Sequence, residues 1–142
     1  MIPAAALLAC FLHLTGPKAE LVEKVWLAGG VDAVAMVWME SRFDPQAERI
    51  ERDKQGRMIG TSFGLYQLFD KYHPQWRGDL MRHIAGGQLF LDECKARTPN
   101  LRWAVARYNG SLAWGIRVEA ERDELVRWLS WRALRELEVA WR

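Results

Sequence analysis

Apolar residues recur at intervals of three and four along most of the chain. Leu21, Val25 and Ala28 lie on one face of a segment that ends at Gly29-Gly30. This spacing is the signature of an amphipathic helix, and a glycine pair is a usual place for one to end. The same reasoning predicts further helices over 32–40, 78–97, 101–111 and 118–142.

The last of these segments carries the longest apolar stripe. The stripe consists of Leu125, Leu129, Ala133, Leu137 and Ala140, widened by Trp128, Trp131 and Trp141. Ordinary packing against a core explains it. A helix with Trp and Arg side by side also suits a partner protein or a membrane surface, so membrane contact stays open.

Residues 48–61 do not follow the helical pattern. Short polar and apolar stretches flank Gln55-Gly56, which predicts a small β-hairpin or a long irregular loop. The next residues, 63–70, are expected to enter another helix. The sequence therefore predicts one domain over 1–142 of the α+β class, predominantly α-helical, with one small β-hairpin.

Glu40 stands at the end of an unusually apolar run. Residues 33–39 are seven apolar side chains, preceded by Asp32 as the expected helix cap and followed by Ser41 and Arg42. A helix that is apolar on most sides is buried. Burial and the negative end of the helix dipole both disfavour a charged carboxylate, so we expect a raised pKa for Glu40. A general acid needs such a pKa, although most glutamates at helix ends are simply solvated.

Composition excludes several classes of function. The net charge is +2, and Lys and Arg are scattered among Asp and Glu, which argues against nucleic acid as a partner. The three histidines, His13, His73 and His83, lack metal-ligand spacing, so neither a metal nor another cofactor is expected. Cys10 and Cys94 are compatible with one disulfide or with two thiols.

The first 16 residues permit two interpretations. They are apolar and end at Gly16-Pro17, as a first core helix would. They also have about the length of an export signal, but no Lys or Arg precedes the apolar run. The run is too short to cross a bilayer, which takes about 20 residues. No clear signal peptide is present.

Three short motifs place polar groups inside apolar surroundings. They are Glu40-Ser41 with Phe43-Asp44-Pro45, Gly64-Leu65-Tyr66-Gln67, and Tyr108-Asn109-Gly110-Ser111. In this order and at this spacing they resemble the lysozyme-like lytic transglycosylases, which include the soluble transglycosylase domains and the goose-type lysozymes. The resemblance covers roughly residues 20–115. Each motif alone is too common to identify a family. The three motifs in this order are a specific signal for this one.

This resemblance implies an enzyme that cleaves the β-1,4 bond between N-acetylmuramic acid and N-acetylglucosamine in peptidoglycan. It makes Glu40 the catalytic acid, hydrogen-bonded by Tyr108. It places Gln67 in the substrate cleft, with Ser41, Ser62, Gly64, Tyr66 and Asn109 as further substrate-binding candidates. Asn109 is also suited to capping a helix, Gly64 to an ordinary turn, and Tyr66 either to stacking on a sugar or to the core.

Ser62 departs from the two-carboxylate pattern of glycosidases. In c-type lysozymes an Asp lies two residues before the glycine that matches Gly64, and that place is Ser62 here. A single acid favours the transglycosylase reaction, in which the sugar's own C6 hydroxyl attacks and forms a 1,6-anhydro ring. A hydrolytic lysozyme is the alternative.

The expected setting follows from the substrate. The protein is expected to act on glycan strands in the periplasm or at the cell wall, as a phage-encoded or bacterial exported enzyme. A place in a phage virion or in a secretion assembly is also consistent with this interpretation. A function of another class, a non-catalytic wall-binding or structural component, also fits the fold.

Overall fold

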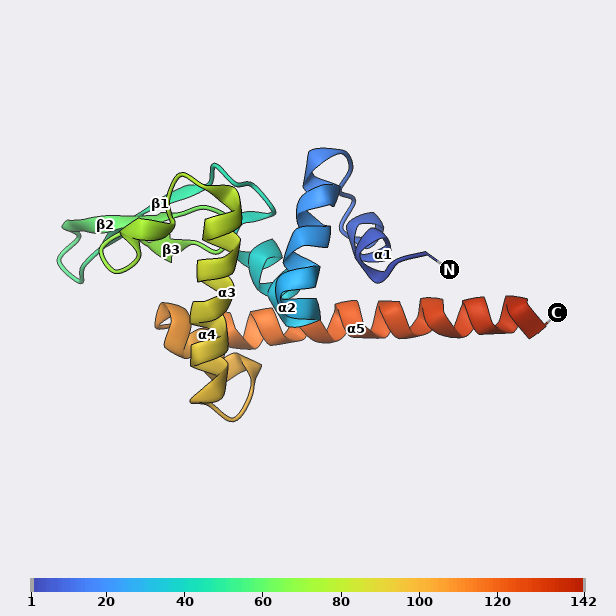
Figure 1. Ribbon diagram of the computed structural model, residues 1–142. Helices are drawn as coiled ribbons and strands as arrows, with labels where there is room; N and C mark the ends of the chain where they lie inside the picture. The colour runs from blue at the N-terminus through green and yellow to red at the C-terminus, as the bar shows by residue number, and fades with distance from the viewer. Residues whose placement is uncertain (1, 142) are drawn as a thin grey trace.

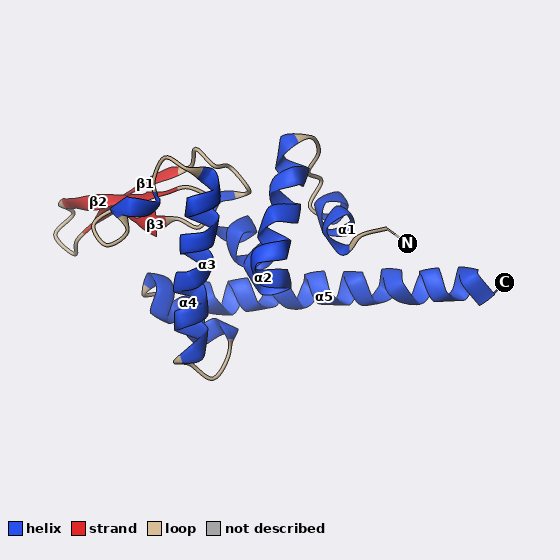
Figure 2. Ribbon diagram, in the orientation of Figure 1, coloured by secondary structure: helices blue, strands red, loops and turns tan. Residues whose placement is uncertain are grey.

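Helices form most of the molecule, and a small sheet lies at one end. The computed structural model describes residues 2–141, with side chains through residue 139. In chain order the helices are α1 (Ala4–Phe11), α2 (Pro17–Ser41), α3 (Leu80–Ala96), α4 (Leu101–Asn109) and α5 (Leu112–Trp141), with a short 3-10 turn η1 (Pro74–Trp76) before α3. Figures 1 and 2 show the sheet at one end of the molecule and both chain ends at the other. The prediction of a predominantly helical α+β fold is confirmed.

Helix α1 packs onto the body of the protein. Leu8 and Leu12 are buried, and the helix contacts both α2 and α5. Phe11 lies against Trp128 of α5, with 5.3 Å between the ring centroids. The N-terminal apolar segment thus forms a core helix in this structure.

Helix α2 has a kink at Gly30, where the sequence predicts a stop. Gly30 has φ 68° and ψ −156°, a backbone conformation that a residue with a Cβ rarely adopts. Beyond the kink, residues 33–37 are all fully buried at the centre of the core. Asp32 does not act as the expected cap, because its carboxylate binds Lys95 of α3 and Arg122 of α5 instead.

The expected hairpin is present and gains a third strand. Strands β1 (Glu48–Arg52) and β2 (Met58–Phe63) are antiparallel, with Arg49 opposite Ser62 and a bulge after Glu51. Strand β3 (Leu68–Phe69) pairs with the end of β2. Side chains alternate between the two faces of a strand, so Arg49, Glu51 and Ser62 share one face of this sheet.

The expectation of a helix over residues 63–70 is wrong. Gly64 has φ 74° and Gln67 has φ 48°, and two left-handed residues in four cannot continue a right-handed helix. The segment turns back on itself between β2 and β3. The residues between the two left-handed positions, Leu65 and Tyr66, are fully buried.

Helix α3 continues without a break through Gly86-Gly87. A Cβ added at Gly86 would lie 2.2 Å from the Trp76 ring, and one at Gly87 would lie 2.4 Å from Cγ of Tyr66. Both glycines therefore permit close packing rather than a bend. The same helix carries Cys94, which is buried, while Cys10 of α1 is exposed; both are free thiols.

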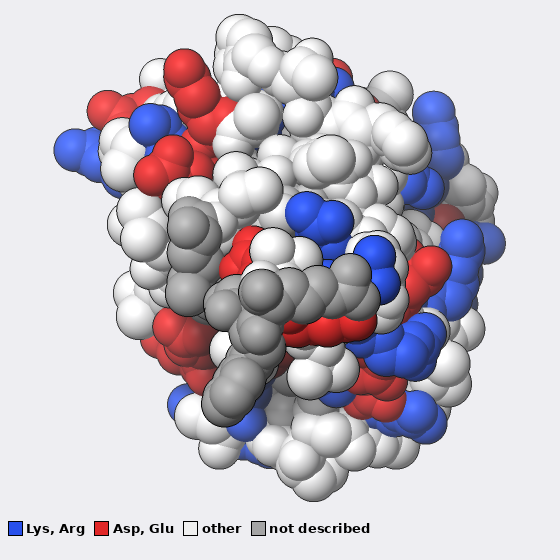
Figure 3. Space-filling view, turned by 90° about the vertical axis from the view of Figure 1, so that its right-hand side faces the viewer, with Lys and Arg blue, Asp and Glu red and all other residues white. Residues whose placement is uncertain are grey.

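Helix α5 extends well past the helices that pack on it (Figure 1). Leu125 is fully buried, whereas Leu134 and Leu137 are 66% and 59% exposed. The predicted stripe is therefore core only in its first half. On the face of the molecule where the chain ends lie, side chains of both signs are interspersed (Figure 3). None of the helices within residues 2–141 combines the length and the apolar character needed to cross a membrane.

Candidate functional site

Glu40 is partly buried at the C-terminal end of α2, against two other helices. Its Oε1 accepts a hydrogen bond of 2.8 Å from the indole Nε1 of Trp114, in the first turn of α5. A second hydrogen bond, of 3.1 Å, comes from Nδ2 of Asn109 at the end of α4. Its Oε2 is buried and, among the described residues, has no hydrogen-bond partner.

This environment favours the protonated form of Glu40. Burial raises the pKa of the carboxyl group above its usual value, against the opposing effect of the Trp114 hydrogen bond and of Arg49 and Asn109. Both partners of Oε1 are N–H donors, so Oε1 must accept and the proton of the neutral acid belongs on Oε2. The guanidinium of Arg42 lies over the Trp38 ring, 4.4 Å from its centre.

A cavity of about 250 Å³ lies between the sheet and helices α3 and α4, and Asn109, a partner of Glu40, is part of its lining. We call it the sheet cleft. Its polar lining consists of Arg49, Glu51, Ser62, Gln67 and Asn109. Aromatic side chains supply most of the rest: Phe69, Tyr72, His73, Phe90 and Tyr108. Flat rings beside a few polar groups are what a sugar-binding cleft requires, because sugars present apolar faces and hydroxyl edges.

Tyr108 lies near Glu40 but does not bind it. Its hydroxyl donates a 2.6 Å hydrogen bond to the backbone oxygen of Tyr66. The expected hydrogen bond to Glu40 is therefore wrong for this chain, and Trp114 and Asn109 take that place. Burial, together with the nearby Glu40 carboxylate, raises the pKa of Tyr108 well above its usual range, so the hydroxyl stays neutral.

Tyr66 belongs to the core and not to the cleft. Its side chain is fully buried and its hydroxyl donates to Oε1 of Gln88 over 3.0 Å. Stacking of Tyr66 on a sugar is therefore excluded in this arrangement. Its backbone amide donates to Nε2 of His83, which fixes the turn on which Gln67 sits.

Gln67 and Asn109 both line the sheet cleft, as the resemblance implies. The Gln67 amide nitrogen is already used within the protein, since it donates to the backbone oxygens of Ala47 and Gly64. Asn109 has two roles: its Oδ1 accepts from the amide of Ser111, while its Nδ2 binds Glu40. The C-cap of α4 is Gly110, so Asn109 holds the turn into α5 and binds Glu40 but does not cap a helix itself.

Ser41 and Gly64 lie outside the sheet cleft. The Ser41 hydroxyl is buried and donates to the backbone oxygen of Val37 within α2, so it has no free group for a substrate. Gly64 combines a left-handed turn with close packing, because a Cβ there would lie 2.5 Å from the His83 ring. Both candidates therefore shape the backbone around Glu40 and Gln67 rather than contact the cleft.

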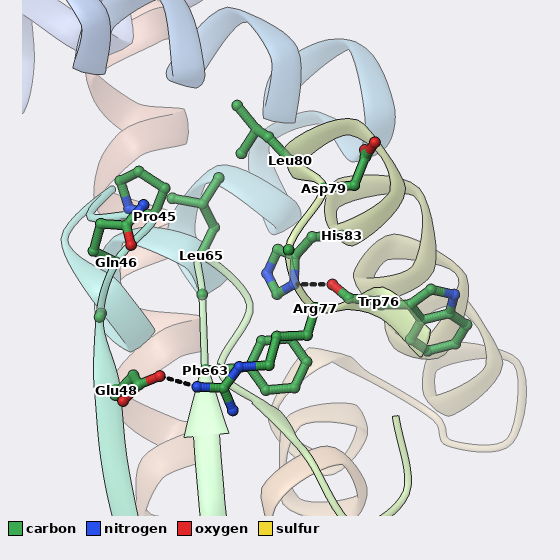
Figure 4. Close-up of a pocket in the computed structure, with 13 residues that line it drawn as sticks. Pro45, Gln46, Glu48, Phe63, Leu65, Trp76, Arg77, Asp79, Leu80 and His83 are labelled. Carbon is green, nitrogen blue, oxygen red and sulfur yellow. Dashed lines mark hydrogen bonds and ion pairs between the residues drawn. The ribbon is translucent and has the colours of Figure 1, made fainter. Parts of the chain in front are cut away.

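A second cavity, of about 350 Å³, lies on the other face of the hairpin (Figure 4). Phe63, Arg77 and His83 line it, and Arg77 pairs with Glu48 and lies over the Phe63 ring. Strand β2 separates the two cavities, since Ser62 points to one and Phe63 to the other. Asn109 lines the sheet cleft and binds the candidate acid Glu40, so that cleft is the stronger candidate site.

Sequence reasoning missed Trp114 and Glu51. Trp114 follows the third motif by only three residues, but nothing in its spacing relates it to Glu40. Glu51 lies in the predicted hairpin, where no motif assigns its side chain a direction. Its position two residues after Arg49 on a predicted strand is the signal that could have placed both on one face.

Comparisons with models of known protein families, with curated proteins and with solved structures find no match to this chain.

Proposed function

We propose that this protein is a peptidoglycan lytic transglycosylase. It cleaves the β-1,4 bond between N-acetylmuramic acid and N-acetylglucosamine, with Glu40 as the single acid and base. One observation carries the proposal: the Glu40 carboxyl group has its Oε1 fixed by two donors, one of which, Asn109, lines a polar and aromatic cleft, and its buried Oε2 has no hydrogen-bond partner among the described residues. The order of the three motifs along the chain supports it.

The arrangement suits proton donation to a leaving group. Trp114 and Asn109 hold Oε1, so rotation of the carboxyl group is restricted and the proton of the neutral acid lies on Oε2, which is shielded from solvent before substrate binds. Burial keeps that proton in place at a pH where a solvated glutamate has lost it. In the first step Oε2 gives its proton to the glycosidic oxygen, and the bond from that oxygen to C1 of the muramic sugar breaks.

The second step returns the proton to Glu40 without using water. The Glu40 carboxylate removes the proton from the C6 hydroxyl of the same muramic sugar, and the C6 oxygen bonds to C1. The products are a shorter glycan with a free 4-hydroxyl and a 1,6-anhydromuramic end. Because the nucleophile is part of the substrate, the reaction gains the advantage of proximity.

The substrate defines where this activity takes place. Glycan strands of the cell wall are the proposed partner, so the protein acts in the periplasm or at the wall. Both a phage-encoded lysis or virion enzyme and an exported bacterial enzyme that opens the wall for a secretion machine are consistent with that site of action.

Mass spectrometry of muropeptides released from purified peptidoglycan tests the proposal. The wild type is expected to release anhydro products, which are inert to borohydride. Glu40→Gln keeps the acceptor oxygen for Trp114 but cannot donate a proton, so it should release none. Glu23→Gln, an exposed glutamate on the same helix, is the matched control and should retain full activity.

Hydrolysis on the same fold is the second candidate, favoured by the presence of Glu51 in the same cleft. It predicts products with reducing ends. Release of no product by the folded wild type would overturn both enzymatic functions and leave a wall-binding or structural role.

A further inference from the structure

A carboxylate other than that of Glu40 lines the sheet cleft, on strand β1. Glu51 of β1 lines the cavity together with Ser62, Tyr108 and Asn109. Side-chain alternation places Glu51 on the same face of the sheet as Arg49, and the register puts Arg49 directly opposite Ser62. Ser62 of β2 stands where c-type lysozymes have an Asp. In this chain a carboxylate, that of Glu51, lies on the neighbouring strand instead.

Two donors hold Glu51 in this position. The Ser62 hydroxyl donates a 2.7 Å hydrogen bond to its Oε1, and Nε of Arg49 donates another over 2.9 Å. Partial burial works against the charge, but these hydrogen bonds and the Arg49 charge lower the pKa of Glu51 below its usual value. Glu51 therefore stays ionised under conditions in which Glu40 is protonated.

The two carboxyl groups interact electrostatically. The negative charge of Glu51 contributes to the raised pKa of Glu40, and the positive charge of Arg49 opposes it. Asn109 bridges the space between them, since it lines the sheet cleft and binds Oε1 of Glu40. Tyr72, His73 and Tyr108 are the other ionisable groups that line the cleft beside Arg49. Burial lowers the pKa of His73, against the effect of Glu93, and raises that of Tyr108, so both groups favour their neutral forms. Enzymes that pair an acid with a charge-stabilising carboxylate usually place the two groups in different environments. These environments move the two pKa values apart.

We propose that Glu51 stabilises the positive charge that develops at C1 of the muramic sugar, while Glu40 protonates the leaving oxygen. Ser62 acts through Glu51 and is a positioning residue. This inference rests on the proposed function and adds a second group to it. No bond to Glu51 forms or breaks, because its role is to face an oxocarbenium-like transition state with a fixed negative charge.

Four variants separate this role from a structural one. Glu51→Gln removes the negative charge. Glu51→Asp keeps the charge on a side chain that is shorter by one methylene group. Ser62→Ala removes one of the two hydrogen-bond donors to Glu51. Glu48→Gln is the matched control, since Glu48 lies on the same strand but lines the other cavity. Each is assayed for kcat and KM against pH, and the Glu40 carboxyl is titrated directly by NMR.

For Glu51→Gln, kcat is expected to fall about 100-fold with little change in KM, the typical cost of losing one electrostatic stabiliser. The pKa of Glu40 should fall as well, so the high-pH limit of activity moves to lower pH. Glu51→Asp should preserve the Glu40 titration and recover part of kcat, and Ser62→Ala should lose less than Glu51→Gln. Glu48→Gln should match the wild type.

The outcomes distinguish this inference from the proposed function. If the wild type releases muropeptides and Glu51→Gln releases them equally fast with an unchanged Glu40 titration, the role of Glu51 is overturned and the function stands. If the wild type releases nothing, both are overturned. If Glu51→Gln does not fold, Glu51→Asp and Ser62→Ala decide: unchanged kcat in both overturns the role.

Discussion

Trp114 Nε1 lies 2.8 Å from Oε1 of Glu40 and donates a hydrogen bond to it. The two residues are 74 positions apart in the sequence, so this contact exists only because α5 begins against the end of α2. It fixes Oε1 of the candidate acid, while the buried Oε2 has no hydrogen-bond partner within the described part of the chain. The indole also opposes the effect of burial, because its hydrogen bond favours the charged form.

Trp114→Phe is expected to impair the acid without unfolding the protein. Loss of a hydrogen bond to an ionisable group costs about 1.5–3 kcal/mol, so kcat should fall at least about 10-fold. The pKa of Glu40 should rise, and the high-pH limit of activity should move to higher pH. A pH–rate profile together with NMR titration of Glu40 measures both effects. The control is Trp103→Phe, at an exposed site on α4, which should change neither kcat nor the pKa of Glu40. A Trp114→Phe variant with the same pH–rate profile as the wild type would contradict the positioning role of Trp114.

Glu40 is expected to cost the folded protein stability at neutral pH. Below its ordinary pKa of 4.5 the carboxyl is protonated in both the folded and the unfolded chain. As pH rises, the unfolded chain loses the proton first, and the folded state loses stability until pH passes its raised pKa. Glu40→Gln cannot ionise, so its Tm should exceed that of the wild type by a few degrees at pH 7.5 and match it near pH 4. Equal Tm values at both pH values would show that burial imposes no such cost.

Asp32 is expected to stabilise the junction of three helices. Its carboxylate binds Nζ of Lys95 over 2.7 Å and Nη1 of Arg122 over 3.0 Å, with little exposure to solvent. Asp32→Asn should lower the free energy of unfolding by about 1–3 kcal/mol, since two cations lose a charged partner. Urea denaturation measures this. The control is Arg57→Ala, which removes a pair with Asp53 at an exposed site and should cost less than about 1 kcal/mol. Similar losses in both variants would argue against a special role for Asp32.

Leu125 and Leu137 belong to one sequence stripe but should differ sharply in their contribution to stability. Leu125 is fully buried, and Leu125→Ala should lower the free energy of unfolding by about 2–5 kcal/mol. Leu137 is 59% exposed, and Leu137→Ala should stay within about 0.5 kcal/mol of wild type. Chemical denaturation of the two variants gives the comparison. A large loss in Leu137→Ala would mean that a second copy of the chain covers the end of α5 in solution.

Helices and breaks that depend on nearby residues can be predicted from the amino-acid order alone. Apolar spacing predicted the helices of the core, and the glycine pair at 29–30 marked a break that the structure has as a kink. The seven apolar residues before Glu40 predicted a buried helix end and a raised pKa, and burial has that effect. These features depend on neighbours within one or two helical turns, which the order of residues specifies directly.

The groups that face one another across the site are brought together by the tertiary structure. Tyr66 is core because α3 brings Gly87 against its ring, and Glu51 joins the cleft because the hairpin register sets Arg49 opposite Ser62. Trp114 reaches Glu40 because α5 starts beside α2, and the same helix leaves Leu137 exposed because nothing described packs there. Such contacts join residues far apart in the sequence. The hydrophobic pattern shows that a side chain prefers burial, but the path of the whole chain determines whether another element covers it.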